Sequence, residues 1–250
     1  MRSRRLPRSL WSWVVLLGVF AVGLPVAAQP PAAPPAASCP APAPKQAAGA
    51  KPAAGKPDRE TKAQQAVKQF ESESREVFQK RHQIVDACRL EPGMDVADIG
   101  AGSGLFTRLF AAKVAPDGKV YAVDIVKNYV DHIVETAKKE KLANVVGVVC
   151  TADSTELAPH SIDLAFVCDT YHHFNHPEKN LASIHRALRP GGRLVVVEFK
   201  KEKGVAPDWV MKHVRPDRET LIKEVTEAEF ALVDEPALMK MQQVYRFVKK

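Results

Sequence analysis

Three glycines alternate at positions 100, 102 and 104, and aspartates lie before and after them, at positions 98 and 124. Glycine has no side chain, so the backbone can turn tightly and a ligand can approach the main chain. The carboxylate of Asp124 can accept hydrogen bonds from both hydroxyls of a ribose. A short apolar strand, a glycine turn, a helix and a distant carboxylate together predict a nucleoside-binding site.

The spacing of these glycines differs from that of a dinucleotide-binding turn. The dinucleotide fingerprint, Gly-x-Gly-x-x-Gly, would place its third glycine at position 105 when counted from Gly100, but residue 105 is Leu. Alternating glycines alone are also compatible with an ordinary tight turn. Asp98 and the correctly spaced Asp124 favour the binding site, and Leu105 argues against a nicotinamide oxidoreductase.

Hydrophobic periodicity predicts the elements that position these residues. Strands are expected at 94–99, 119–123, 145–149, 162–167, 194–199, 230–233 and 243–248. Helices are expected at 58–90, 103–114, 128–141, 177–188 and 217–228, with Ser72 or Ser74 capping a second helix inside the first range. Alternating strands and helices form a parallel sheet covered on both faces, and the last two strands are expected to pair antiparallel. The ligand is expected at the strand tips, near the switch between the first and fourth strands.

From about residue 75 to the C-terminus, the order of motifs resembles that of class I S-adenosylmethionine-dependent methyltransferases acting on small molecules, particularly the group around the ubiquinone and menaquinone biosynthesis enzymes. Asp98-Ile-Gly-Ala-Gly-Ser-Gly104 matches the first motif, Val123-Asp124 the ribose acid and Thr151-Ala-Asp153 the adenine-binding acid. The fourth strand (161–166), the loop after it (169–174) and the turn before the fifth strand (188–192) match as well.

The resemblance implies a Rossmann-like, doubly wound α/β fold. Its sheet has seven strands in the order 3-2-1-4-5-7-6, with strand 7 antiparallel. Glu229 departs from the family pattern, because these enzymes usually place Gly before strand 6. If the backbone there requires a positive φ, a non-glycine residue costs about 1 kcal/mol.

The resemblance also implies S-adenosyl-L-methionine as the cosubstrate and a set of residues that bind it. These are Asp98, Gly100, Ala101, Gly102, Gly104, Asp124, Ile125, Ala152, Asp153 and Asp169. The amide groups of 100–105 at a helix N-terminus suit the methionine carboxylate, and Asp98 can neutralise the ammonium. Asp124 is expected to hold the ribose and Asp153 the adenine edge. An alternative for Asp153 is a helix cap or turn residue, since Ser154 and Thr155 follow it.

His172 and His173, in the loop after the fourth strand, are the candidate catalytic residues. Either imidazole could take a proton from a hydroxyl or amine acceptor as the methyl group arrives. Alternatively, one is structural, and proximity alone drives the reaction. We expect no metal site of His172, His173, His176 and Asp169, because helix or strand spacing does not bring all four together.

Two further features could contribute to the acceptor side. Glu198, at the tip of the fifth strand, either orients the acceptor or is a solvated loop carboxylate. Residues 201–216 form a long connection of the kind that often acts as a lid. Trp209, Met211 and His213 in it are expected either to line the acceptor pocket or to belong to an irregular helix packed on the domain.

The net charge of +7 does not indicate a nucleic-acid partner. Residues 1–57 contain seven of the 36 lysines and arginines and no acidic residue, which leaves 29 basic against 29 acidic residues in 58–250. The basic character therefore belongs to the N-terminal segment, and no electrostatic footprint for DNA or RNA remains.

Residues 1–28 resemble a secretory signal peptide, with a basic start, an apolar stretch and Val26-Ala27-Ala28 before Gln29. The alternative is an uncleaved anchor, and membrane contact would then occur through this leader only. Both predict an exported domain, periplasmic or extracellular. Residues 29–57, with nine Pro and eleven Ala, predict a disordered linker. Residues 58–250 are expected to form the methyltransferase domain.

The four cysteines, at 39, 88, 150 and 168, form no C-x-x-C pair. Cys150 and Cys168 end strands that should lie three places apart, about 14 Å, which is too far for a disulfide. We expect buried, reduced thiols.

The sequence thus predicts methyl transfer from S-adenosylmethionine to a small-molecule acceptor. The alternative is a non-catalytic binder of S-adenosylmethionine or a related nucleoside, exported as a sensor or scaffold.

Overall fold

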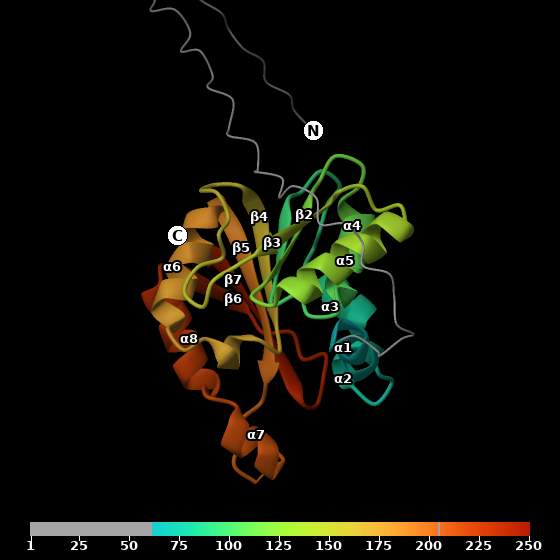
Figure 1. Cartoon of the computed structure of the whole chain (residues 1–250). Helices are drawn as coiled ribbons and strands as arrows, with labels where there is room; N and C mark the ends of the chain where they lie inside the picture. The colour runs from blue at the N-terminus through green and yellow to red at the C-terminus, as the bar shows by residue number, and fades with distance from the viewer. Residues whose placement is uncertain (1–61, 205) are drawn as a thin grey trace, which may run out of the picture. The chain divides into compact units, whose positions relative to one another are not determined.

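Among the described residues, seven strands form one sheet in the order β3-β2-β1-β4-β5-β7-β6 (Figure 1). The computed structural model describes residues 62–204 and 206–250, so the predicted signal peptide, the linker 29–57 and Cys39 lie outside the described residues. The strands are β1 (Val96–Ile99), β2 (Val120–Asp124), β3 (Val145–Val149), β4 (Ile162–Cys168), β5 (Leu188–Phe199), β6 (Phe230–Asp234) and β7 (Gln242–Lys249). β7 pairs antiparallel with both β5 and β6, which confirms the predicted order and direction.

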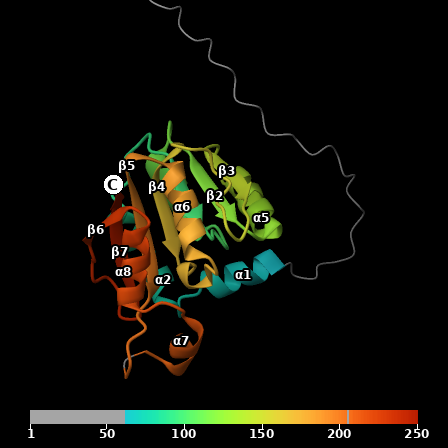
Figure 2. The same cartoon turned by 90° about the vertical axis from the view of Figure 1, so that its left-hand side faces the viewer.

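Helices cover both faces of this sheet. The helices of the described residues are α1 (Lys62–Phe70), α2 (Glu76–Gln79), α3 (Arg81–Ala87), α4 (Leu105–Val114), α5 (Lys127–Lys139), the 3₁₀ turn η1 (Tyr171–His173), α6 (Pro177–Ala187), α7 (Asp208–His213) and α8 (Arg218–Glu227). Figure 2 shows α6 and α8 in front of the sheet, while α1, α2 and α7 lie at the end where the parallel strands finish. No helix in the described ranges is long and apolar enough to cross a membrane.

Strand β4 shows why both faces are buried. Leu164 and Phe166 pack with residues of α2, α3 and α4, whereas Ala165 and Val167 pack with residues of α6 and α8. Successive side chains of a strand point to opposite faces, so a strand that is covered on both sides reads as a continuous apolar run. All four residues are fully buried.

The long helix predicted at 58–90 is wrong in its middle, because the structure has α1, α2 and α3 separated by turns. Ser72 Oγ accepts a hydrogen bond from the Ser74 amide at 3.2 Å, a local contact that competes with helix formation. Neither serine caps α2, whose N-cap is Arg75. The turn brings Arg75 to the carboxyl end of β4, where it contacts the residue after that strand.

Strand β5 begins at Leu188 rather than at residue 194 as predicted, so it includes the turn expected at 188–192. Leu188 pairs with Ile162 and Arg193 pairs with Leu164, with an irregularity between these two pairs. A bulge of this kind adds residues to one strand while pairing resumes beyond it.

The three described cysteines are free thiols, as predicted. Cys150 follows β3 and Cys168 ends β4, and β2 and β1 lie between these strands. Cys88 is buried, but the expectation of burial is wrong for Cys150 and Cys168, which are only partly buried. Both thiols reach the cavity described below.

Candidate functional site

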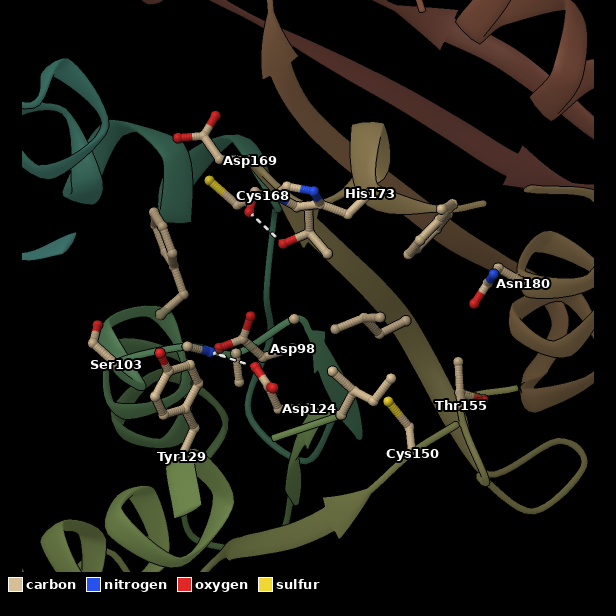
Figure 3. A pocket seen from close by; sticks show the side chains of 18 of the residues that line it. Asp98, Ser103, Asp124, Tyr129, Cys150, Thr155, Cys168, Asp169, His173 and Asn180 are labelled. Carbon is tan, nitrogen blue, oxygen red and sulfur yellow. Dashed lines mark hydrogen bonds between the residues drawn. The ribbon is translucent and has the colours of Figure 1, made fainter. Parts of the chain in front are cut away.

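A cavity of ≈ 410 Å³ lies at the carboxyl ends of β1, β2, β3 and β4 (Figure 3). This is where ligands bind in open α/β sheets, and the volume is typical of a small-molecule site. Of the predicted site residues, those that line it are Asp98, Gly100, Ala101, Gly102, Asp124, Ile125, Ala152, Asp169 and His173. Gly104, Asp153 and His172 do not line it.

The glycine turn is required by the backbone and by the protein's own packing. Gly100, Gly102 and Gly104 have φ of 73°, 54° and 78°, in the left-handed region that favours glycine. A Cβ at Gly100 would lie 2.4 Å from the side chain of Thr170, and one at Gly104 would lie 2.8 Å from Ile133. Gly104 is the N-cap of α4, so this helix begins two residues later than predicted. Packing thus adds a second reason for glycine to the ligand approach argued from the sequence.

Asp124 ends β2 and is nearly buried. Its Oδ2 accepts from the Gly102 amide at 2.9 Å (Figure 3). Its Oδ1 accepts from the Val126 amide at 2.8 Å. These bonds tie the carboxylate to the glycine turn and fix its direction. A carboxylate has about four acceptor positions, so two remain for the hydroxyls of a ribose.

Asp98 lies at the end of the central strand β1 and is 3% exposed. Its Oδ2 accepts from the Thr107 hydroxyl at 2.6 Å. Burial raises the pKa of Asp98 to about 6, the hydrogen bond from Thr107 opposes this rise, and the charge of Asp124 adds to it. A nearby cation would stabilise the ionised form of the Asp98 carboxyl, which burial disfavours. The site therefore suits an ammonium group.

Asp169 directly follows β4 and adopts a φ of 46°, which is uncommon for a residue other than glycine. Its Oδ2 accepts from Arg75 Nη2 at 2.5 Å. Its Oδ1 is buried and has no hydrogen-bond partner among the described residues. Burial raises the pKa of Asp169 to about 7, the charge of Glu198 raises it further, and Arg75 lowers it.

Asp153 is adjacent to the cavity, because its neighbours Ala152 and Ser154 line it. Its Oδ2 accepts from Lys179 Nζ at 2.9 Å, while its Oδ1 is buried without a partner in the described part of the chain. The helix-cap alternative is wrong, because no helix begins at this point. Asp153 does lie in a bend, where the Thr151 amide donates to the Ser154 carbonyl at 3.1 Å. Ser154 Oγ accepts from the Glu156 amide at 3.2 Å.

The two candidate catalytic histidines have different surroundings. His172 is buried, and its Nδ1 lies 2.9 Å from the carboxylate oxygens of Glu198. His173 lines the cavity. Burial and then the neighbouring rings of His172 and His213 lower the pKa of His173.

Glu198 fits neither of the two interpretations made from the sequence. It is 1% exposed, and its Oε2 also accepts from the His172 amide at 3.0 Å. It therefore holds the η1 turn and the His172 ring. A solvated loop carboxylate is excluded by this burial, and the cavity is not lined by Glu198.

Several residues that line the cavity were missed from the sequence. They include Phe70, Arg75, Tyr129, Phe174 and Asn180. Arg75 was missed because one long helix was predicted over 58–90. The sequence Ser72-Glu73-Ser74 is nevertheless typical of a turn that interrupts a helix. Asn180 also holds the cavity wall, because its Nδ2 donates to the Ala152 carbonyl at 2.9 Å.

Residues of the expected lid do not line the cavity. Trp209 of α7 is half exposed and packs against Phe199, with ring centroids 4.9 Å apart. Val210 is fully buried, which fits the alternative of a short helix packed on the domain. His213, at the end of α7, instead meets the rings of His172 and His173.

Comparison with known proteins places this geometry in a family. Residues 97–196 match the model of the methyltransferase domain. The ubiquinone/menaquinone biosynthesis C-methyltransferase UbiE of Bordetella avium (strain 197N) is 31% identical over 139 residues, 53% of this chain and 52% of that protein. The protein of the same description from Hydrogenovibrio crunogenus is 28% identical over 180 residues, 60% of this chain and 70% of that protein. The chain thus spans about half the length of the first of these relatives.

Solved structures share the fold at lower identity. A SAM-dependent methyltransferase from Aquifex aeolicus has a TM-score of 0.67 at 22% identity, over 76% of this chain and 100% of that one. The [4+2]-cyclase SpnF has a TM-score of 0.60 at 16% identity, over 68% of this chain and 80% of that one. These structures share the fold. Together with the strand order, the match of residues 97–196 to the methyltransferase-domain model shows that the chain carries a class I S-adenosylmethionine-dependent methyltransferase domain, distantly similar to the UbiE C-methyltransferases.

Proposed function

We propose that the protein transfers a methyl group from S-adenosylmethionine to a small-molecule acceptor. The observation that carries this proposal is the convergence of Asp98, Asp124 and the glycine turn on one cavity, in the motif order of the family. The fit is chemical as well as topological. A cation-favouring carboxylate, a carboxylate with free acceptor positions and a helix N-terminus match the ammonium, ribose and carboxylate of this cosubstrate.

The adenine end is assigned to the wall formed by Ala152 and Asp153. The unpartnered Oδ1 of Asp153 is an acceptor suited to an exocyclic amino group. Lys179 already holds the other oxygen and keeps the carboxylate ionised, since it lowers the pKa of Asp153. Cys150 and Ile125 would then contact the base and ribose as apolar neighbours.

The residues of the cavity then have separate tasks in the reaction. S-adenosylmethionine supplies an electrophilic methyl group on a cationic sulfur. Methyl transfer requires reacting atoms about 3–3.5 Å apart and in line, so fixed positions of both substrates matter most. Apolar side chains such as Phe70 and Phe174 exclude water from the cavity.

His173 is the candidate proton acceptor of the reaction. It borders the cavity, and its lowered pKa keeps the imidazole neutral, the form that accepts a proton. His172 is a positioning residue, since Glu198 holds its ring and it does not border the cavity.

The proposal is tested with the purified full chain. Calorimetric titration with S-adenosylmethionine and S-adenosylhomocysteine should show one site per chain. Incubation with candidate small-molecule acceptors should then release S-adenosylhomocysteine in step with methylated product. A folded protein that binds neither compound would overturn the proposal.

A non-catalytic binder remains the second candidate, and the likeness to SpnF supports keeping it. SpnF has this fold and is described as a [4+2]-cyclase, so the fold alone does not fix the reaction. Cosubstrate binding without turnover on any acceptor of a broad panel would favour the binder.

We also propose that the protein is exported, on the strength of the basic and apolar leader in residues 1–28. The mature chain would begin at Gln29. N-terminal sequencing of the protein recovered from its native compartment tests this, and an intact leader there would indicate an anchor instead.

A further inference from the structure

We propose that His172, His173 and His213 bind a divalent transition-metal ion of the zinc class, with Glu198 orienting His172. This site is additional to the cosubstrate cavity. It joins two segments that are distant in sequence, the η1 turn after β4 and the C-terminal end of α7.

The three imidazoles already converge. One ring nitrogen of each lies within 4.8 Å of those of the others. The ring centroids are 4.1 Å apart for His172 and His173, 5.1 Å for His172 and His213, and 5.3 Å for His173 and His213. Zinc–nitrogen bonds of about 2.0–2.1 Å in a tetrahedron place nitrogens about 3.4 Å apart. The rings of His173 and His213 are exposed and can rotate, which would bring the ring nitrogens from within 4.8 Å of one another to the distance that zinc requires.

Glu198 gives His172 the arrangement expected of a metal ligand. The Nδ1 of His172 lies 2.9 Å from the Glu198 carboxylate, which leaves Nε2 free to bind a metal. The side chains are 4% and 1% exposed, so this pair is rigidly held. Metal-binding histidines almost always donate the other ring N–H to such a partner, which fixes the tautomer and raises ligand basicity.

The other two rings have no competing polar partner. Among the described residues, no hydrogen bond to the ring of His173 or His213 is found, in contrast with His172. Three rings that pack only for apolar contact would not need a buried carboxylate behind one of them.

This ligand set differs from the one considered from the sequence. His176 Nδ1 lies 3.8 Å from Glu178 at the start of α6, and Asp169 pairs with Arg75. His213 supplies the third ligand instead.

The fourth coordination position would open toward the cavity, because His173 borders both. Three protein ligands with one open position are typical of catalytic rather than structural zinc. If the proposed function holds, this position would take water or an oxygen or sulfur donor of the acceptor, whose pKa a metal lowers. The metal would then promote loss of the acceptor's proton to water in place of the His173 imidazole, because a metal-bound ring has no lone pair left to accept a proton. The acceptor class is then a small molecule with an ionisable hydroxyl or thiol.

The experiment is metal binding by the full chain without a histidine tag, in the absence of cosubstrate. Zn²⁺ is titrated in competition with a chromophoric chelator, and Co²⁺ is used for its ligand-field spectrum. We expect one ion per chain and the intense visible bands of four-coordinate Co²⁺. His213→Ala, at an exposed helix end, should weaken Zn²⁺ binding at least 100-fold and abolish these bands.

Two further variants separate a site from adventitious binding. Glu198→Gln should weaken Zn²⁺ binding 10- to 100-fold while the protein stays folded. His176→Ala, which removes a nearby exposed histidine, should leave both affinity and spectrum unchanged. Unchanged binding in His213→Ala, or equal losses in His213→Ala and His176→Ala, would overturn the proposal.

Calorimetry with S-adenosylhomocysteine on the same samples keeps this proposal apart from the proposed function. Absence of metal binding in a chain that still binds S-adenosylhomocysteine would overturn the metal site alone. Metal binding without S-adenosylhomocysteine binding would support the site and overturn the proposed function.

Discussion

Arg75 and Asp169 form an ion pair of 2.5 Å that joins the turn before α2 to the end of β4. Arg75 and Phe70 both line the cavity, although they precede residues 97–196, which match the family model. The N-terminal helical segment therefore completes the site. A second ion pair, of Arg108 with Glu71 at 2.8 Å, holds the same segment against α4.

The raised pKa of Asp169 predicts a pH-dependent effect of Asp169→Asn on stability. The folded protein favours the protonated form up to about pH 7, whereas the unfolded chain releases this proton near 3.8. Stability from this group is therefore complete below about pH 4 and falls as pH rises toward 7. One pKa unit corresponds to about 1.4 kcal/mol, so ionised Asp169 costs up to about 4 kcal/mol at pH 8.

Asn retains an acceptor for Arg75 but leaves that cation less well paired, so we expect Asp169→Asn to gain about 2 kcal/mol at pH 8 and nothing at pH 4. Urea unfolding at both pH values measures this. Asp153→Asn is the control of opposite sign, because Lys179 lowers the pKa of Asp153. The native Asp153 carboxylate stabilises the folded protein at pH 8 and loses this effect on acidification, so Asp153→Asn should lower stability at pH 8 only. A pH-independent loss in Asp169→Asn would contradict the prediction.

Asp98→Asn should weaken binding of S-adenosylhomocysteine about 10- to 100-fold at pH 8, because a charge-assisted contact to the ammonium becomes a neutral one. In the wild type, affinity should fall as pH drops through about 6, the raised pKa of Asp98. The variant should lose this pH dependence. Isothermal calorimetry between pH 5 and 8 measures both effects.

Two comparisons locate the effect of Asp98→Asn. Binding of 5′-methylthioadenosine, which lacks the amino-acid part, should be nearly unchanged by Asp98→Asn but weakened by Asp124→Asn. Asp86→Asn, at an exposed site on α3, should change neither. Equal losses for both ligands in Asp98→Asn would place Asp98 in a structural role.

Gly100→Ala should cost about 2 kcal/mol or more of stability, for two separable reasons. The backbone has a φ of 73°, and the new Cβ would lie 2.4 Å from the side chain of Thr170. Gly93→Ala isolates the backbone cost, because Gly93 has a φ of +87° and nothing within 4 Å of its Cβ position. That variant should lose only about 1 kcal/mol.

The double variant Gly100→Ala with Thr170→Ala should recover part of the difference between these two glycine sites. Thr170 Oγ1 and Cγ2 are the closest atoms, but its Cβ at 2.9 Å remains. Urea unfolding of the wild type, Gly100→Ala, Thr170→Ala and the double variant gives the coupling energy between the two sites. A coupling of zero would mean that the loop shifts to make room.

The strands could be predicted from the sequence because local patterns mark them, whereas their full order in the sheet was implied by the family resemblance. Runs such as 145–149 and 162–167 carry the strand signal, and the right-handed crossover rule then restricts their order. The turn 100–104 with Asp98 and Asp124 was predictable for the same reason, since a strand, a turn and the next strand tip are neighbours in any such fold.

The rest of the site depends on contacts between residues distant in sequence. Arg75 and Asp169 are 94 residues apart, and His172 and Glu198 are 26 apart. No local period reveals such pairs, so Glu198 was assigned to the acceptor or to solvent. The meeting of His213 with His172 depends on the path of α7, which short-range patterns do not define.

Glu229, where the family usually has Gly, shows that a departure from a family pattern can indicate backbone strain. The sequence predicted a cost if φ were positive there, and φ is 64°. Glu229 follows the C-cap Ala228 of α8, the position where helices commonly end in a left-handed residue, usually glycine. Glu229→Gly should therefore raise the free energy of unfolding by about 0.5–1 kcal/mol, the relieved strain exceeding the entropy cost of glycine.

Glu229→Ala is the matched control, because it removes the carboxylate and keeps the Cβ that causes the strain. It should bring no gain in urea unfolding, and neither variant should alter binding of S-adenosylhomocysteine, because Glu229 does not line the cavity. If alanine stabilised the protein as much as glycine, the side chain's charge beside the α8 C-terminus, and not the backbone, would be the cause.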